Sequence, residues 1–368
     1  EMLRSLVGSE MCIRDRDWTD KNDKISHSTG KFFSIQGIRV STNYGLVPQW
    51  DQPIINQPEI GFLGFIVQRK QNVLHFLLQA KIEPGNLNVI QLSPTLQATR
   101  SNYTRVHKGR SPLYLEYFTG EKKVEILVDQ LQSEQGARFY QKRNRNIIVE
   151  VDENEELPVY ENFVWASLGQ IKELLTYPNV INMDTRTVIS CIQYGNYSEK
   201  DLQLLSVFRL DTNLGHSDSF LYSVLSSDNH YNTMNSIIRW LTSLKFKYEL
   251  NVDKIGLSEM NNWIYDGNVI EHKDKKYFSV IGVDVSIGNR EVTHWDQPMV
   301  KAAQEGIMGF LVKKINGIYH FLVQAKLECG NFDIVELAPT VQCLTGNYRN
   351  GQNEYSIPYI DNLSLIHI

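Results

Sequence analysis

The sequence lacks the residues and runs that mark several common classes of protein. Only 4 of its 368 residues are cysteine, and they show neither CxxC spacing nor a paired His/Cys motif, so neither a zinc site nor a disulfide framework is predicted. No uninterrupted apolar run approaches membrane-spanning length. The net charge of −5 does not favour a nucleic-acid or membrane-surface binder, because phosphates and anionic lipids attract basic surfaces. We therefore expect a cytoplasmic protein without metal, nucleic-acid or membrane binding.

Several catalytic motifs are missing as well. Neither the dinucleotide-binding GxGxxG nor the phosphate-binding GxxxxGK[ST] occurs in the sequence, and GxSxG and HExxH do not occur either. No cofactor is therefore predicted.

An internal repeat is the strongest feature that the sequence does contain. The run HFLLQAKIEPGN from His75 recurs as HFLVQAKLECGN from His320, and WDQP at Trp50 recurs at Trp295, in both cases 245 positions later. The predicted divisions are a first repeat at 17–192, an inter-repeat helical segment at 193–261 and a second repeat at 262–361. Residues 1–16 and 362–368 resemble translated sequencing-adapter sequence and are expected to be non-native. The second repeat is expected to lack its last part.

Hydrophobic periodicity predicts an α+β protein in which each repeat is a mixed sheet with flanking helices. Two helices are predicted, at 165–177, where Ser167 and Gln170 form a capping box, and at 232–246. The apolar stripe of the second helix is expected to face inward. Strands are predicted at 34–41, 62–67, 74–81, 88–92, 124–129 and 146–151.

The predicted strand at 74–81 carries a polar row. Because side chains alternate along a strand, His75, Gln79 and Lys81 share one face. The same set recurs at His320, Gln324 and Lys326. We predict that the row lines a polar pocket in the first repeat. A half-solvated strand is the alternative.

The WDQP tetrapeptide supports two interpretations. Trp50, Asp51 and Gln52 suit a ligand loop in which the indole stacks on a base or sugar, and Trp295 repeats the arrangement. A turn held by a buried tryptophan before a proline explains the pattern equally well.

The segment 133–146 concentrates basic side chains in an otherwise acidic chain. Arginine side chains match diphosphate oxygens in a bidentate manner, so this segment is predicted to hold a nucleotide diphosphate. The residues involved are Arg138, Lys142, Arg143 and Arg145. A solvated charged segment is the alternative, and single-stranded RNA binding is a third reading.

These segments resemble one enzyme family. The runs FFSIQGIRVS, LQAKIEPGN, SEQGARFYQKRNRN and NMDTRTVISC are similar to those of the NDP-hexose 2,3-dehydratases, and the resemblance covers nearly all of residues 18–361 in both repeats. The resemblance implies two repeated Nudix-like mixed-sheet domains and a homodimer. The catalytic box of Nudix pyrophosphatases, GX5EX7REUXEEXGU, does not occur, so that activity is not implied.

The family reaction removes water across C2 and C3 of an NDP-4-keto-6-deoxyhexose, with dTDP-4-keto-6-deoxyglucose as the expected substrate. It requires a base at C3, a general acid at the C2 hydroxyl and donors for the enolate oxygen. The residue types available for proton transfer are Glu134, Tyr140, His75 and Lys81. A non-catalytic NDP-sugar-binding protein of the same fold, or an enzyme of another reaction, is the alternative.

Overall fold

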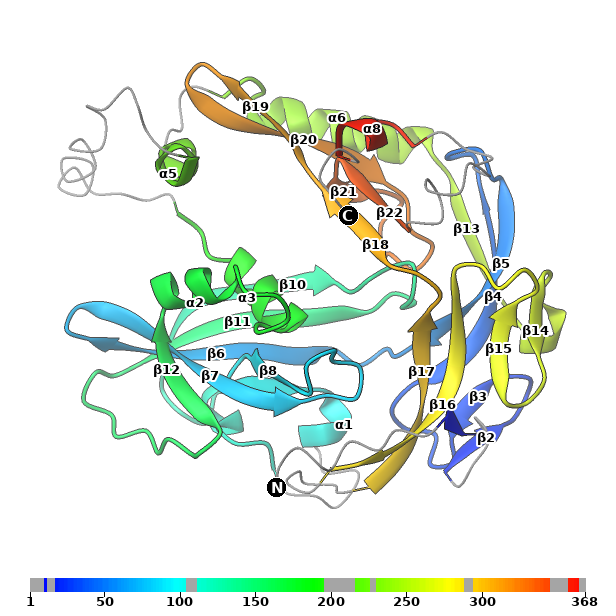
Figure 1. Ribbon diagram of the computed structural model, residues 1–368, viewed down its shortest axis with the longest axis horizontal. Coiled ribbons are helices and arrows are strands. Elements are labelled where there is room, and N and C mark those ends of the chain that lie inside the picture. The colour runs from blue at the N-terminus through cyan, green and yellow to red at the C-terminus, as the bar shows by residue number, and fades with distance from the viewer. Residues whose placement is uncertain are drawn as a thin grey trace.

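A computed structural model describes residues 10–11, 17–103, 111–194, 216–225, 230–287, 294–344 and 357–363. The fold is α+β and mostly β, as Figure 1 shows. We call residues 17–192 the first half and residues 262–361 the second half.

A seven-stranded mixed sheet forms the body of the first half. Its strands are β6 (Gly61–Lys70), β7 (Val73–Ile82), β8 (Ile90–Ser93), β9 (Leu96–Ala98), β10 (Glu125–Ser133), β11 (Arg143–Val151) and β12 (Phe163–Ser167). The main path runs β10-β11-β6-β7-β12, with β8 paired to β7 and β9 to β6. Only the pairing of β11 with β6 is parallel. The predicted mixed sheet is therefore confirmed for the first half, whereas the described strand pairs of the second half are antiparallel.

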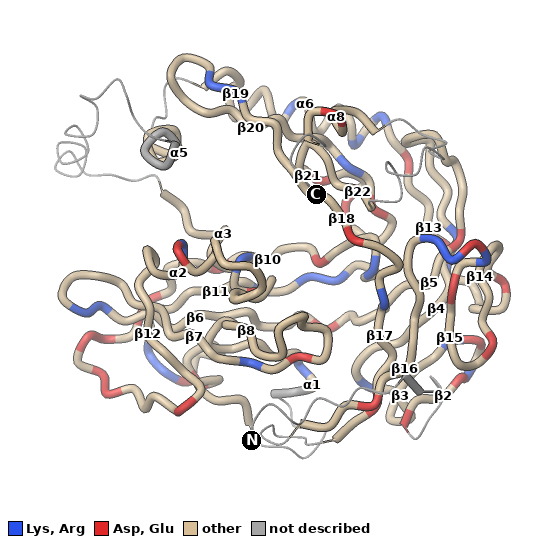
Figure 2. The backbone as a smooth tube through the Cα atoms, in the orientation of Figure 1, with Lys and Arg blue, Asp and Glu red and all other residues tan. Residues whose placement is uncertain are grey.

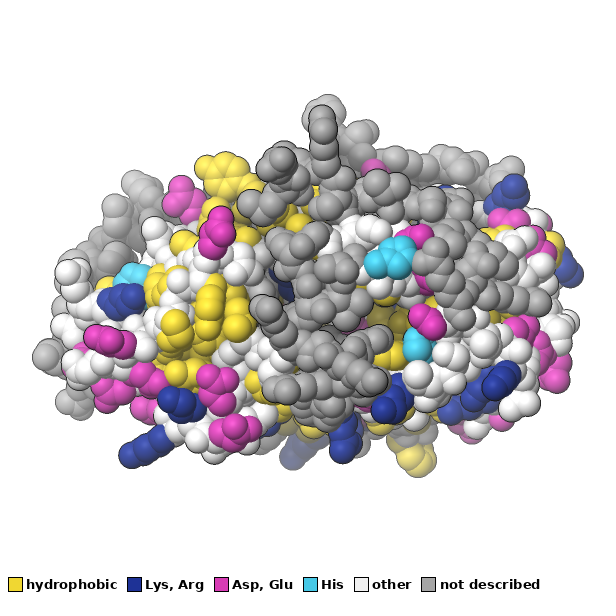
Figure 3. Space-filling view, turned by 90° about the horizontal axis from the view of Figure 1, so that it is seen from below, with side chains coloured by type: hydrophobic (Ala, Val, Ile, Leu, Met, Phe, Trp, Pro, Cys, Tyr) yellow, Lys and Arg dark blue, Asp and Glu magenta, His cyan; other side chains and the backbone are white. Residues whose placement is uncertain are grey.

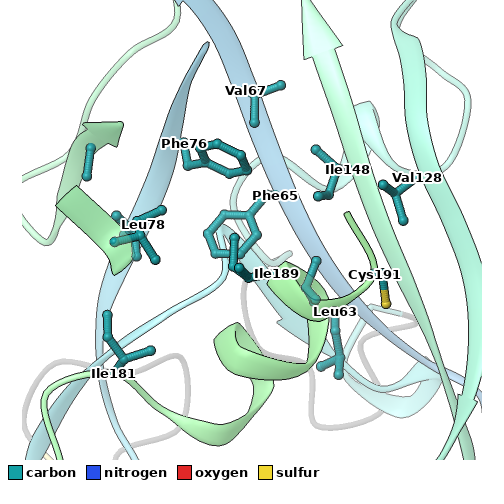
Figure 4. Close-up of a cluster of buried hydrophobic side chains, with 13 residues drawn as sticks. Leu63, Phe65, Val67, Phe76, Leu78, Val128, Ile148, Ile181, Ile189 and Cys191 are labelled. Atoms are coloured by element: carbon teal, nitrogen blue, oxygen red, sulfur yellow. The ribbon is translucent and has the colours of Figure 1, made fainter. Parts of the chain in front are cut away.

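Helices α2 (Leu168–Leu174) and α3 (Met183–Ser190) cover one face of this sheet (Figure 1). Phe65 and Phe76 pack edge to face beneath them, with ring centroids 5.5 Å apart. Figure 4 shows Ile189 and Cys191 in the same cluster. Helix α1 (Arg100–Tyr103) follows β9, and the opposite face is covered by residues 114–118, which include the 3₁₀ turn η2 (Leu115–Tyr117). Apolar side chains therefore point to both faces of the central strands, as in other sheets that are covered on two sides.

The boundaries of the first predicted helix were partly wrong. The capping box of Ser167 and Gln170 is present, but the helix begins at Leu168. The residues before it form β12, which pairs with the edge of β7. Pairing along the strand edge satisfies their backbone groups and overrides the helical apolar pattern.

Two five-stranded sheets lie beside the large sheet. The first contains β2 (Trp18–Asp20), β3 (Ile25–His27), β4 (Ser34–Thr42), β5 (Gln49–Asn56) and β13 (Leu250–Ile255). The second contains β1 (Glu10–Met11), β14 (Trp263–Tyr265), β15 (Val269–His272), β16 (Phe278–Ser286) and β17 (His294–Ala302). Their facing apolar side chains form one shared core, which also includes Leu257 of the turn η4 (Leu257–Glu259).

Reciprocal contacts join the two halves in this shared core. The indole Nε1 of Trp18 donates to the carbonyl of Asp296 at 2.8 Å, and Nε1 of Trp263 donates to the carbonyl of Asp51 at 2.7 Å. Trp18 and Trp263 occupy equivalent positions of the sequence repeat, as do Asp51 and Asp296. Each half therefore supplies the donor for the other.

The rest of the second half follows the strand order of the first. Its strands are β18 (Gly306–Gly309), β19 (Leu311–Ile315), β20 (Ile318–Lys326), β21 (Glu336–Pro339) and β22 (Val341–Leu344). They form separate two- and three-stranded sheets. Phe310 and Phe321 are 44% and 47% exposed, whereas Phe65 and Phe76, at the matching repeat positions, are buried.

The remaining described helices are α5 (His216–Leu225), α6 (Met234–Lys247) and α8 (Ile360–Leu363). Thr233 caps α6 close to the predicted start. The expectation that its apolar stripe faces inward was wrong in part, because Ile238 and Trp240 are exposed and no α6 side chain is fully buried. None of the described helices is both long and apolar enough to cross a membrane.

The reciprocal bonds predict the effect of one substitution. Trp263→Phe leaves the Asp51 carbonyl buried without its donor, which we expect to lower the free energy of unfolding by about 1–3 kcal/mol. Trp240→Phe, on the exposed side of α6, serves as the control and should stay within about 0.5 kcal/mol of wild type. Urea unfolding measures both, and equal midpoints for the two variants would contradict the prediction.

Candidate active site

A pocket of about 240 Å³ lies where the β10–β11 hairpin and the start of α3 meet the segment between β20 and β21 of the second half. Its lining is polar and acidic. The lining residues are Leu63, Gln132, Ser133, Glu134, Gln135, Asn144, Asn146, Met183, Asp184, Thr187, Glu328, Asn331 and Glu336. No lysine or arginine belongs to this lining.

The start of α3 is fixed by the capping residue Asn182. Its side chain accepts a hydrogen bond from the backbone N–H of Thr185 at 2.8 Å and donates to Oε1 of Gln97 at 3.2 Å. The Thr185 hydroxyl donates to the carbonyl of Leu92 at 3.1 Å. These contacts anchor the first turn of α3 on β8 and β9, and they place Asp184 at the pocket.

Asp184 is the most strongly perturbed acid of the pocket. Burial, with the carboxylates of Glu83 and Glu134 acting in the same direction, raises the pKa of Asp184 to about 7 against the opposing effect of the Lys81 ammonium. A carboxyl group with this pKa holds its proton near neutral pH and can donate it.

Glu134, which the sequence predicted as a catalytic residue, lines the same pocket. Its Oε2 accepts from Nδ2 of Asn144 at 2.9 Å, and its Oε1 accepts from the backbone N–H of Gln135 at 3.2 Å. The backbone N–H of Glu134 is itself bonded to the carbonyl of Lys142 at 2.9 Å. The carboxylate is therefore held in one orientation.

The second half closes the pocket through a close approach of two backbones. The N–H of Gly330 donates to the carbonyl of Gly136 at 2.7 Å, and the N–H of Gln141 donates to the carbonyl of Gly330 at 2.6 Å. The Ser133 hydroxyl donates to Oε1 of Glu336 at 2.8 Å. A Cβ atom on Gly330 would lie 1.8 Å from the carbonyl oxygen of Phe139, so only glycine fits this position.

The predicted polar row on β7 is not part of this lining. His75 lies near the turn between β6 and β7, and its Nδ1 is 3.0 Å from the carbonyl of Val73. Leu77, between His75 and Gln79 on the same face, is buried in the core. Lys81 donates to the carbonyl of Gln97 at 3.2 Å, and its ammonium acts to lower the pKa of Asp184. The row is therefore interrupted, and only its Lys81 end approaches the pocket.

The matching residues of the second half also contact the protein, and Lys326 repeats the contact of Lys81. Lys326 donates to the carbonyl of Gln342 at 3.1 Å, and Gln324 donates to the carbonyl of Pro339 at 2.9 Å. His320 accepts from the backbone N–H of Tyr231 at 2.9 Å. None of these three residues lines the pocket.

The WDQP residues lie within β5 and β17, and their polar groups contact the protein. Nε1 of Trp50 donates to Oε1 of Gln52 at 2.9 Å, and the same bond joins Trp295 to Gln297 at 2.9 Å. Asp51 accepts from Arg39 at 3.0 and 2.9 Å, and this arginine contributes to holding the pKa of Asp51 below its ordinary value against the effect of burial. These contacts favour the structural interpretation of the motif.

All four cations in the basic segment contact other groups of the protein. Arg145 forms a bidentate pair with Asp129 at 2.7 and 2.6 Å. The Lys142 ammonium is buried and donates to the carbonyl of Glu59, and burial lowers its pKa. Arg138 stacks on Phe278 at 3.9 Å, and burial lowers its pKa.

Arg143 and Tyr140 complete the placement of the predicted residues. The Arg143 guanidinium lies 4.1 Å from the ring centroid of Phe332, and its buried Nε makes no hydrogen bond with the described residues. Tyr140 packs against the apolar cluster around Ile38, beneath the ammonium of Lys254 at 4.7 Å. Tyr140 is not among the residues that line the pocket.

One group with metal-ligand character occurs among the described residues, outside the pocket. Asp284, His294 and Asp296 offer ligand atoms that all lie within 4.8 Å of one another. His294 Nδ1 is 3.3 Å from Oδ1 of Asp284 and 2.9 Å from the Ser286 hydroxyl.

On the face shown in Figure 3, basic and acidic side chains of the described residues are interspersed.

Sequence reasoning missed Asp184 and the approach of second-half residues other than the predicted Trp295, Gln324 and Lys326 to this pocket. A signal for Asp184 was present in NMDTRT, because an asparagine cap at 182 places residue 184 in the first turn of a helix. No local sequence pattern predicts that Glu328, Asn331 and Glu336 approach a pocket whose other residues lie some two hundred positions earlier in the chain. That contact depends on how the halves dock (Figure 2).

The docking turn gives a testable prediction. Gly330→Ala places a methyl group against the Phe139 carbonyl, and we expect the backbone shift to cost about 1–3 kcal/mol and to expose loop 133–142 to protease. Gly306→Ala is the control, because its Cβ would meet only the Cys343 carbonyl at 3.5 Å. Limited proteolysis and thermal unfolding compare the two. Equal digestion of both variants would contradict the prediction.

Asp184 gives a prediction about stability and pH. Its folded pKa of about 7 exceeds the ordinary 3.8, so the folded state holds a proton that the unfolded state has lost. The resulting stabilisation is complete below the ordinary pKa and is lost as pH rises through about 7. Asp184→Asn does not titrate, so its melting temperature relative to wild type should rise between about pH 5 and about pH 8. A constant difference across that range would count against the raised pKa.

Comparison with known proteins agrees with the sequence resemblance. The profile of the family described as NDP-hexose 2,3-dehydratase matches residues 10–192 and 234–366. A dTDP-4-dehydro-6-deoxy-alpha-D-glucopyranose 2,3-dehydratase from Saccharopolyspora spinosa is 44% identical over 344 residues, which cover 93% of this chain and 68% of that protein. Proteins of the same name from Amycolatopsis orientalis and Streptomyces violaceoruber are each 40% identical, over 91% and 92% of this chain and 66% and 71% of their own lengths. The chain thus spans about two thirds of these relatives' lengths, and it belongs to the NDP-hexose 2,3-dehydratase family.

Proposed function

We propose that this protein removes water across C2 and C3 of an NDP-4-keto-6-deoxyhexose, and that the reaction takes place in the pocket between the β10–β11 hairpin and α3. The observation that carries the proposal is the presence of Glu134 and Asp184 in one pocket, with the pKa of Asp184 raised to about 7. Elimination of water needs one group that accepts a proton and another that donates one.

Glu134 acts as the base. The C4 ketone of the sugar acidifies the proton on C3, and the Glu134 carboxylate removes it. The electron pair of the broken C–H bond passes into the C3–C4 bond and onto the C4 oxygen. Asn144 and the Gln135 backbone N–H orient the carboxylate through bonds of 2.9 and 3.2 Å, so these two groups have a positioning role.

Asp184 acts as the general acid. Its proton passes to the C2 hydroxyl as the C2–O bond breaks and water leaves, while the enolate electrons form the C2–C3 double bond. The enol that remains tautomerises to a 3,4-diketone. The step involves no net oxidation or reduction, so the proposed roles require only these two proton transfers.

The charge of the lining supports binding of the hexose, rather than the diphosphate, in this pocket. The acids Glu134, Asp184, Glu328 and Glu336, together with several amides, suit the hydroxyl groups of an uncharged sugar. A diphosphate next to these carboxylates would be repelled. Among the three arginines predicted to bind it, Arg143 fits best, because Arg145 is paired with Asp129 and Arg138 is buried against Phe278.

The names of the relatives favour dTDP-4-keto-6-deoxyglucose as the substrate of this chain. We further propose Nudix-like halves and a homodimer, which follow from the family resemblance, and a cytoplasmic location, which the cysteine usage favours. A non-catalytic sugar-nucleotide binder is the competing assignment. Incubation with dTDP-4-keto-6-deoxyglucose separates the two, because only the enzyme yields a product that is lighter by one water in mass spectrometry.

The proposed roles predict a pH dependence. A general acid works only while it is protonated, so the dehydration rate should fall as pH rises above about 7. Asp184→Asn should lower kcat by about 10²–10⁴-fold and remove that limb of the profile. Asp274→Asn, in an exposed turn outside the pocket lining, is the control. A wild-type rate in Asp184→Asn would exclude Asp184 as the acid.

A further inference from the structure

The reaction places a negative charge on the C4 oxygen, and the pocket as a whole is poorly suited to that charge. Glu134, Asp184, Glu328 and Glu336 all line it, and no lysine or arginine does. An enolate beside several carboxylates needs a hydrogen-bond donor aimed at its oxygen. The question is which side chain of the lining can supply that donor.

Most side chains of the lining that carry a neutral donor already make at least one hydrogen bond through it. Two of them donate to sulfur atoms, Gln132 to Cys191 at 2.9 Å and Gln135 to Met183 at 3.3 Å. Two donate to carboxylates, Asn144 to Glu134 at 2.9 Å and Ser133 to Glu336 at 2.8 Å. The Thr187 hydroxyl donates to the Met183 carbonyl at 3.1 Å. The amides of Asn146 and Asn331 are the ones that remain.

Asn146 stands out because it is fully buried and unsatisfied. It is 0% exposed, and neither the oxygen nor the nitrogen of its amide makes a hydrogen bond with the described residues. The Cys191 thiol lies beside it and is only a weak partner. A buried polar group without a partner is unfavourable, and in a native protein such a group calls for an explanation.

The position of Asn146 is also rigid. It lies on β11, an interior strand of the large sheet, between Gln130 of β10 and Leu63 of β6. Leu63 belongs to the pocket lining as well. A donor on a central strand is held in place before the substrate arrives, which is what stabilisation of a developing charge requires.

We propose that Asn146 is a catalytic residue whose Nδ2 donates a hydrogen bond to the C4 oxygen of the bound sugar and stabilises the enolate formed when C3 loses its proton. The inference rests on the proposed dehydratase function and adds the group that carries the negative charge. No covalent bond to Asn146 forms or breaks. The electron pair from the C3–H bond rests on the C4 oxygen until the C2 hydroxyl leaves.

The test separates enolate formation from loss of water. With dTDP-4-keto-6-deoxyglucose in D₂O, incorporation of deuterium at C3 reports the enolate, mass spectrometry reports dehydration, and calorimetry reports binding. We expect Asn146→Leu to bind the sugar nucleotide as wild type does while exchange and dehydration both fall by about 10²–10³-fold, which is typical for removal of one such donor. A folded Asn146→Leu that exchanges at the wild-type rate overturns the proposal.

Two further variants keep the test decisive. Asn146→Asp keeps the shape of the side chain but replaces the donor with a carboxylate, so it should lose exchange as well. This variant tests the proposal if the leucine variant does not fold. Asn88→Leu is the control, because Asn88 is exposed and lies outside the pocket lining, where its amide donates to the Asn179 carbonyl at 3.4 Å. Loss of exchange in Asn331→Ala but not in the Asn146 variants would assign the role to Asn331 and overturn the proposal.

The outcomes also distinguish this inference from the function on which it rests. If wild type neither binds nor exchanges the sugar, the dehydratase assignment fails, and this inference fails with it. If wild type dehydrates the sugar and the Asn146 variants do so at the same rate, only the role of Asn146 is lost.

Discussion

The docking of two glycine-containing turns is the constraint on which the candidate site depends. Gly330 of the second half approaches Gly136 of the first closely enough for their backbones to bond at 2.7 Å. That contact brings Glu328 and Glu336 to a pocket whose other wall is the β10–β11 hairpin and α3. The groups that act on the pKa of Asp184 besides burial, Glu83, Glu134 and Lys81, belong to the first half. The second half therefore completes the wall of the pocket, whereas the proposed proton transfers take place on side chains of the first half.

The sequence predicted much of the fold because the relevant signals were local. Alternation identified β4, a mostly apolar run between glycines identified β6, and a following turn signal bounded β7. The capping box at Ser167 located α2 within three residues of its predicted start. The mixed sheet followed from the same patterns. The errors arose where tertiary contacts decide the outcome, as when β12 pairs with β7 and takes residues that were predicted to be helical.

Predicting the site from the sequence was harder, because residue types do not reveal which partners they meet. Glu134 was predicted and lies in the pocket, whereas Tyr140 and His75 lie outside its lining. A basic segment suggests a phosphate site until Arg145 is found paired with Asp129 and Lys142 with a backbone carbonyl. Asp184 and Asn146 owe their proposed roles to burial, which depends on contacts from distant parts of the chain.

The exchanged tryptophan bonds limit how the two halves can be altered separately. Trp18 and Trp263 each complete the hydrogen bonding of the opposite half, and the apolar core between them draws on both. A chimaera that joined the first half to the second half of a relative would have to match both indoles and the shared core at once. Recombination between homologues should therefore succeed at crossovers that keep this core from a single parent, and fail at crossovers that divide it.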